Sequence, residues 1–101
     1  MTMFATSFRE DAIYKPAGPK SRSGLPKYDT EIPVKVRWEP RVQLVQSDDG
    51  EEFVSRGRIF APFQIKPGDR IASSRFGEWK IRTVIPHVRA NGKVAFWVGW
   101  V

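Results

Sequence analysis

The sequence contains no cysteine and a single histidine among its 101 residues. The absence of thiols excludes disulfide scaffolds, thiolate zinc sites, iron–sulfur clusters and cysteine nucleophiles. The one histidine, His87, follows Pro86 near a strand end, and no nucleophile or orienting carboxylate accompanies it in a recognisable catalytic arrangement. We therefore expect a protein that is not an enzyme and that uses no metal or cofactor.

Long apolar runs and phosphate-binding glycine motifs are also missing. No stretch approaches the roughly 18 apolar residues of a membrane-spanning helix, and the first ten residues lack the basic-then-apolar order of a secretion signal. Gly68, Gly77 and Gly92 are isolated, so no G-x-G-x-x-G or Walker pattern supports nucleotide binding. We expect a soluble, unexported protein that is made in the cytoplasm and binds neither a membrane nor a small-molecule substrate.

Acidic residues are few, since 11 Asp and Glu stand against 17 Lys and Arg, for a net charge of +6. Such a balance favours contact with an acidic partner, nucleic acid first. Four of the acids gather at Asp48, Asp49, Glu51 and Glu52, but they lack the spacing of a calcium-binding EF-hand loop. We expect these acidic residues to lie in a solvent-exposed hairpin turn.

The apolar content suffices for one small globular domain, because 41% of the residues are hydrophobic and 13% are aromatic. Composition divides the chain into residues 1–14, 15–30 and 31–101. The first segment is mildly apolar and is expected to form the first strand. The second contains three prolines, two glycines and two serines, which favour a long flexible loop. Its positive side chains are Lys15, Lys20, Arg22 and Lys27.

The third segment shows the two-residue period of β-strands. Val34, Val36 and Trp38 alternate with charged residues, and Pro40 predicts a bulge or bend before the strand continues. Turns are expected at 47–50, 66–69 and 91–92, where Asp, Asn, Pro and Gly gather. Further strands are expected at 53–61, with Gly57 at a bulge or a close backbone approach, and at 70–73, 79–85 and 93–101.

This pattern predicts an all-β fold, a small antiparallel barrel or sandwich of five to six strands that carries a long basic loop near its N-terminal end. A nucleic-acid-binding barrel of the oligonucleotide-binding or cold-shock type fits the size and charge. The side chains available for it are Arg56, Arg58, Phe60 and Phe63. Packing of these aromatic rings in the core is the alternative interpretation.

The last strand is apolar on both faces, which is unusual for a half-exposed strand. Val94, Phe96, Val98 and Trp100 alternate with Ala95, Trp97, Gly99 and Val101. Since Lys80 and Arg82 mark the outer face of the adjoining strand, we assign the face with Trp97 and Val101 to a subunit or partner interface. The face with Trp100 is assigned to the core.

A series of short motifs resembles one family, the head completion proteins of tailed bacteriophages, also called head-tail connector, head closure or stopper proteins. The motifs extend over residues 11–86 and are Ala12-Ile13-Tyr14, Gly24-Leu25-Pro26, Val34-Lys35-Val36-Arg37-Trp38, Asp49-Gly50-Glu51-Glu52 before Ile59-Phe60, Pro67-Gly68-Asp69-Arg70-Ile71 and Trp79-Lys80-Ile81-Arg82-Thr83-Val84.

The resemblance implies a non-enzymatic β-barrel in the virion neck, which forms a homo-oligomeric ring beneath the portal and adaptor proteins. Such a ring closes or extends the channel for packaged double-stranded DNA and joins the capsid connector to the tail. By this resemblance, the loop that carries Lys15, Lys20, Arg22 and Lys27 contacts the neck or faces the channel.

Overall fold

The structure, a computed structural model, describes residues 8–18, 28, 30–47 and 49–101. These residues form an all-β fold with no helix, as the sequence predicts. The strands are β1 (Glu10–Lys15), β2 (Ile32–Gln46), β3 (Glu52–Ala61), β4 (Arg70–Ser73), β5 (Gly77–Lys80), β6 (Thr83–Val88) and β7 (Val94–Trp100).

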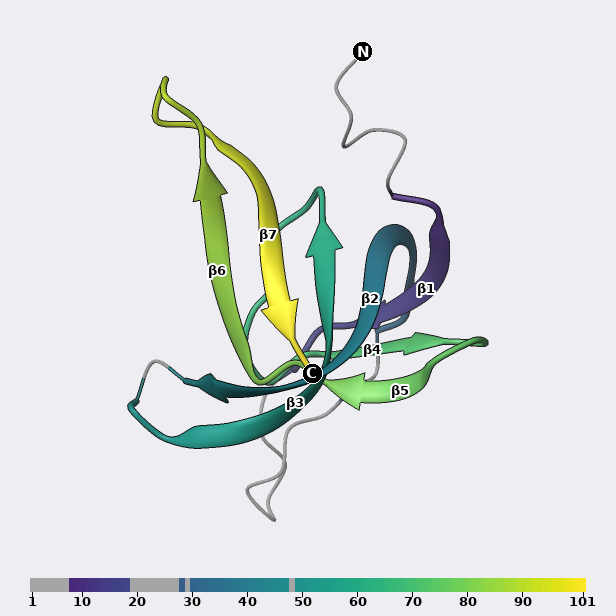
Figure 1. The fold of residues 1–101 in the computed structure, drawn as a ribbon. Coiled ribbons are helices and arrows are strands. Elements are labelled where there is room, and N and C mark those ends of the chain that lie inside the picture. Colours follow the sequence, from purple (N-terminus) through teal and green to yellow (C-terminus); the bar gives the residue numbers. More distant parts are fainter. Residues whose placement is uncertain (1–7, 19–27, 29, 48) are drawn as a thin grey trace.

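All seven strands belong to one antiparallel sheet in the order β5-β4-β1-β2-β3-β7-β6 (Figure 1). The sheet does not close into a complete barrel, because β5 and β6 at its two ends do not pair with each other. β2 joins the two halves of the sheet: its first residues, Ile32 to Val36, pair with β1, whereas Arg37 to Gln46 pair with β3. The sheet thus resembles a sandwich in which one long strand serves both layers.

Residues from both halves meet in one hydrophobic core. Its buried members are Ala12, Tyr14, Val36, Trp38, Ile59, Ala61, Ile65, Ile71, Ile81 and Val101. Val36, Ile59, Ile71 and Ile81 are fully buried, so strands far apart in the sheet depend on the same apolar contacts. Phe76, which follows β4, also stacks on Trp38 of β2 at a centroid distance of 5.2 Å.

The interruptions predicted in the central hairpin are present. Pairing between β2 and β3 shifts register between Pro40 and Gln43, where the sequence predicts a bulge. Gly57 lies opposite this bulge, and a Cβ atom there would come within 3.2 Å of the Glu39 carbonyl oxygen and 3.3 Å of Trp38 Nε1. A glycine is therefore favoured here, because a side chain would be crowded by the backbone of β2 and by the Trp38 ring.

The number of strands differs from the expected five to six, because residues 79–85 do not form one strand. The backbone of Ile81 bonds to the turn before β4, through Ile81 N to Asp69 O and Gly68 N to Ile81 O, both at 2.8 Å. The next amide, Arg82 N, donates to Trp100 O on the other half of the sheet. The chain crosses between the halves at these two residues, which separates β5 from β6.

The first strand, β1, includes Lys15 and pairs with both β2 and β4. The boundary expected between the first strand and the loop, after residue 14, is therefore wrong by one residue, because Lys15 is the last residue of β1. We expect flexibility over residues 15–30, and of these residues 19–27 and 29 lie outside the described residues.

Candidate functional site

The described ends of the basic segment meet at the turn that precedes β4, formed by Lys66 to Arg70. On the N-terminal side, the Asp69 carboxylate accepts hydrogen bonds from Tyr14 Oη, Ala17 N and Lys66 N, the last two at 2.8 and 3.0 Å. On the C-terminal side, Tyr28 Oη donates to Gly68 O at 2.7 Å. Ala17 and Tyr28 are therefore both attached to the same turn. We call this group of contacts the loop base.

Asp69 is the central acceptor of the loop base, and only 4% of its surface is exposed. A carboxylate in this position is stabilised by the donors around it, since an unpartnered buried charge is strongly unfavourable. Burial, and after it the hydrogen bond to Asp69, raises the pKa of Tyr14 well above its ordinary value. The phenol consequently remains a neutral donor throughout the physiological pH range.

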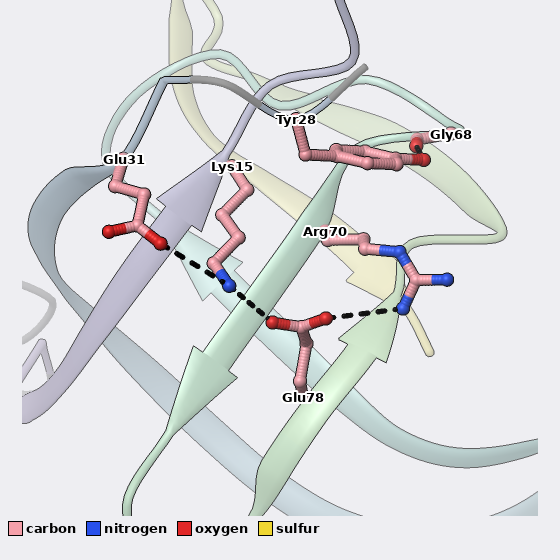
Figure 2. A network of polar contacts seen from close by, with 6 residues as sticks. All are labelled: Lys15, Tyr28, Glu31, Gly68, Arg70 and Glu78. Carbon is pink, nitrogen blue, oxygen red and sulfur yellow. Dashed lines mark hydrogen bonds and ion pairs between the residues drawn. The ribbon is translucent and has the colours of Figure 1, made fainter. Parts of the chain in front are cut away.

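Ion pairs surround the loop base on its exposed side (Figure 2). Lys15 Nζ donates a hydrogen bond to Glu78 Oε1 on β5 and lies 3.5 Å from Glu31 Oε1. The other Glu78 oxygen is 3.4 Å from Arg70 Nη1, and the Arg70 guanidinium lies 5.3 Å from the centroid of the Tyr28 ring. The hydrogen bond between Lys15 and Glu78 is the main cause that raises the pKa of Lys15 and lowers that of Glu78.

These contacts assign Lys15 a role that the sequence does not predict. Its positive charge is already matched by two carboxylates, and its ion pair with Glu78 links the end of β1 to β5 across β4. Lys20, Arg22 and Lys27, the other basic residues expected at the DNA channel, lie outside the described residues. The DNA contact predicted for them stays a prediction.

The assignment of Trp97 and Val101 to a partner interface is contradicted by their burial, although Phe96 on the face of Trp100 is also only 4% exposed. Val101 is 5% exposed and belongs to the core of its own chain, and Trp97 packs against that core. The reason lies in Gly99 on the same face: a Cβ there would come within 2.8 Å of Ile65 Cδ1 and 3.2 Å of Ile81 Cγ2. The missing side chain lets these two isoleucines reach the strand, so the face of Trp97 and Val101 points inward. These two residues thus give no support to an interface there.

The opposite face of the sheet carries a mixed aromatic and basic surface. Arg37 and Arg58 lie 5.7 and 5.4 Å from the centroid of the Phe60 ring, and Glu39 forms an ion pair with each arginine at 2.8 Å. An adjacent hollow is lined by Arg37, Trp38, Glu39, Pro40, Arg41 and Arg58. Three arginines and one glutamate leave this surface positively charged.

The residues considered for a nucleic-acid-binding barrel separate into two environments. Because Arg58 and Phe60 pair directly with Trp100 and Val98 of β7, they lie on the aromatic and basic face, and the alternation of β3 adds Arg56. Phe63 instead contacts Tyr14 at a centroid distance of 5.3 Å and packs against the core. The core interpretation is correct for Phe63 alone.

Other classes of site find little support in the described part of the chain. It contains no cluster of three or more potential metal-ligating side chains. His87 stacks on Phe96 with a centroid distance of 4.5 Å. No helix among the described residues is long and apolar enough to span a membrane.

Comparison of the sequence with protein-family models and with curated proteins found no match.

Proposed function

We propose that the chain is a structural protein of the neck of a tailed bacteriophage, where it forms a ring at the head-tail interface and presents its basic loop to packaged DNA. The proposal combines the order of motifs described above with the all-β body. The partners are further copies of the chain, the portal and adaptor proteins of the head, and proteins of the tail. The protein performs no chemical step.

The observation that carries the proposal is the loop base. A basic segment that reaches into a DNA channel must withstand lateral force, and here both of its ends are held at one turn by the contacts to Asp69 and Gly68. The ion pairs of Lys15 with Glu31 and Glu78 neutralise the charge at the root of the segment. The net positive charge of the segment is thereby concentrated at Lys20, Arg22 and Lys27.

Labelling and complementation test this proposal. An antibody to the chain is expected to label the head-tail junction of particles in electron micrographs. Phage that lack the gene should yield heads without joined tails, and supplying the protein in trans should restore joining. Absence of the chain from particles, or normal joining without the gene, contradicts the proposal.

Charge reversal tests the role of the loop. Lys20→Glu combined with Arg22→Glu is expected to reduce the nuclease-protected DNA retained in heads, because phosphate contacts depend on positive charge. The matched control combines Arg9→Glu with Lys80→Glu, two exposed basic residues outside the loop base that form no ion pair with a described residue. Equal DNA retention in both double variants would remove the loop from the proposed function.

A free nucleic-acid-binding barrel remains the second candidate, favoured by the surface around Arg37, Arg58 and Phe60. An aromatic ring between guanidinium groups is suited to stacking on unpaired bases. Binding of a single-stranded oligonucleotide that Phe60→Ala weakens about tenfold would favour this candidate, since stacking contributes ~1–3 kcal/mol per base. The neck protein should show only weak, salt-sensitive binding to duplex DNA.

A further inference from the structure

Most of the large apolar side chains exposed by the described residues lie on two hairpins. The β2–β3 hairpin exposes Val42, Leu44 and Val54, and the β6–β7 hairpin exposes Ile85, Val88 and Val94. These six side chains are 39–66% exposed, and elsewhere among the described residues the large exposed apolar side chains are Ile32 at 41% and Trp79 at 37%. Concentration of apolar surface on projecting elements indicates an interaction site.

The outer parts of both hairpins extend beyond the body of the sheet. β3 and β7 pair only between Arg58–Ala61 and Trp97–Trp100, so each hairpin continues past this region as a two-stranded ribbon. Figure 1 shows the two ribbons leaving the body in different directions, with β6–β7 rising away from β2–β3. Two-stranded ribbons with exposed apolar side chains are marginally stable alone and gain from further contacts.

The two hairpins carry opposite charge. Residues 42–54, the acidic hairpin, contain four acidic and no basic side chains, whereas residues 85–96, the basic hairpin, contain Arg89 and Lys93 and no acid. Glu51, Glu52, Arg89 and Lys93 are exposed and form no ion pair with a described residue. Each hairpin therefore combines available charge of one sign with apolar surface.

We propose that the acidic hairpin of one copy of this chain docks on the basic hairpin of the next copy. Both complementary surfaces are present on a single chain, which favours a second copy over an unrelated partner. Apolar side chains would meet in the centre of the contact, and Glu51 and Glu52 would face Arg89 and Lys93 at its rim.

Such a contact is heterologous, since each copy contributes a different surface to its two neighbours. Heterologous contacts repeat from copy to copy and generate either a closed ring or an open filament. The inference deepens the proposed function, because it identifies the surfaces through which the ring would assemble, and it rests on that function for the ring itself.

A charge-swap experiment tests this pairing. One variant carries Glu51→Lys and Glu52→Lys, and the other carries Arg89→Glu and Lys93→Glu. Alone, each variant brings like charges together and should self-associate at least about tenfold more weakly than the parent. An equimolar mixture should recover association, because both kinds of contact between unlike variants again join opposite charges. Sedimentation velocity measures all three samples.

Two controls make the result decisive. The Arg9→Glu and Lys80→Glu double variant should associate like the parent, and thermal unfolding must show that every variant is folded. The inference is overturned if the parent remains monomeric up to about 1 mM, if either swap variant associates normally, or if the mixture fails to recover.

These outcomes are independent of particle labelling. Recovery in the mixture without neck labelling would retain the pairing of hairpins and refute the neck function. Neck labelling together with a monomeric parent would support the neck function and refute the pairing of hairpins.

Discussion

The loop base and the tip of the acidic hairpin both lie where the sheet meets solvent, yet their carboxylates are used differently. Asp69 is 4% exposed and accepts three hydrogen bonds, two of them from residues distant in the sequence. Glu51 and Glu52 are exposed and have no ion-pair partner among the described residues. Asp69 therefore stabilises the fold, whereas the carboxylates of Glu51 and Glu52 are available to another molecule.

Removal of the central carboxylate should have the largest effect on stability. Asp69→Ala leaves the Tyr14 hydroxyl and the amides of Ala17 and Lys66 without their acceptor, and we expect the free energy of unfolding to fall by ~3–4 kcal/mol. Urea denaturation measures this loss. Leu44→Ala on the acidic hairpin is the control and should change stability by less than about 0.5 kcal/mol. Equal losses in the two variants would contradict the distinction between the regions.

Truncation of Trp97 should have the next largest effect, because its ring packs against the core. We expect Trp97→Ala to lower the free energy of unfolding by ~2–3 kcal/mol, somewhat below the value typical of fully buried aromatic residues. Trp79→Ala on the exposed edge strand β5 serves as the control and should cost less. Unchanged stability in Trp97→Ala would restore the orientation expected from the sequence.

The ion pairs at the loop base should contribute least, since they are exposed to solvent and screened by salt. The folded-state pKa of Glu78 lies below its ordinary value, so its contribution is present above the glutamate pKa of about 4.3 and is lost as the pH falls through the lowered value. Glu78→Gln should therefore lower the denaturation midpoint slightly at pH 7, less so in high salt, and match the parent in acid.

Glu52→Gln, at the tip of the acidic hairpin, is the matched control for this measurement. It should leave the midpoint at pH 7 unchanged in low and in high salt, since no described cation pairs with Glu52. A difference between Glu78→Gln and the parent that persisted in acid would indicate that Glu78 acts through packing and not through charge.

Much of the local structure follows from short-range signals. The period of two places Val36 and Trp38 in the core, and the bulge at Pro40 follows from its missing amide. The turns at 47–50 and 91–92 are likewise present, with Gly50 N bonded to Ser47 O at 2.9 Å and Lys93 N bonded to Asn91 Oδ1 at 3.0 Å. Each of these features depends on residues that are close together along the chain.

The candidate site was less accessible to such reasoning. Lys15 looks like any other member of a basic segment, and only the pairing of β1 with β4 brings it next to Glu78, 63 residues away. Asp69 occupies an ordinary turn motif whose sequence does not reveal that Tyr14 and Ala17 will donate to it. The one available signal was an acid followed by a strand, and this signal is common to many turns.

The sequence by itself determined the all-β class, the hairpins, the bulge and the absence of thiol chemistry, because backbone sterics, turn chemistry and composition act locally. Only the tertiary structure decided which face of β7 points inward, since both faces are apolar and the choice depends on Ile65 and Ile81 filling the space above Gly99. It also decided where 79–85 divides, because the amides of Ile81 and Arg82 bond to opposite halves of the sheet. Alternation along a strand defines two faces, and the partners that cover each face come from distant parts of the chain.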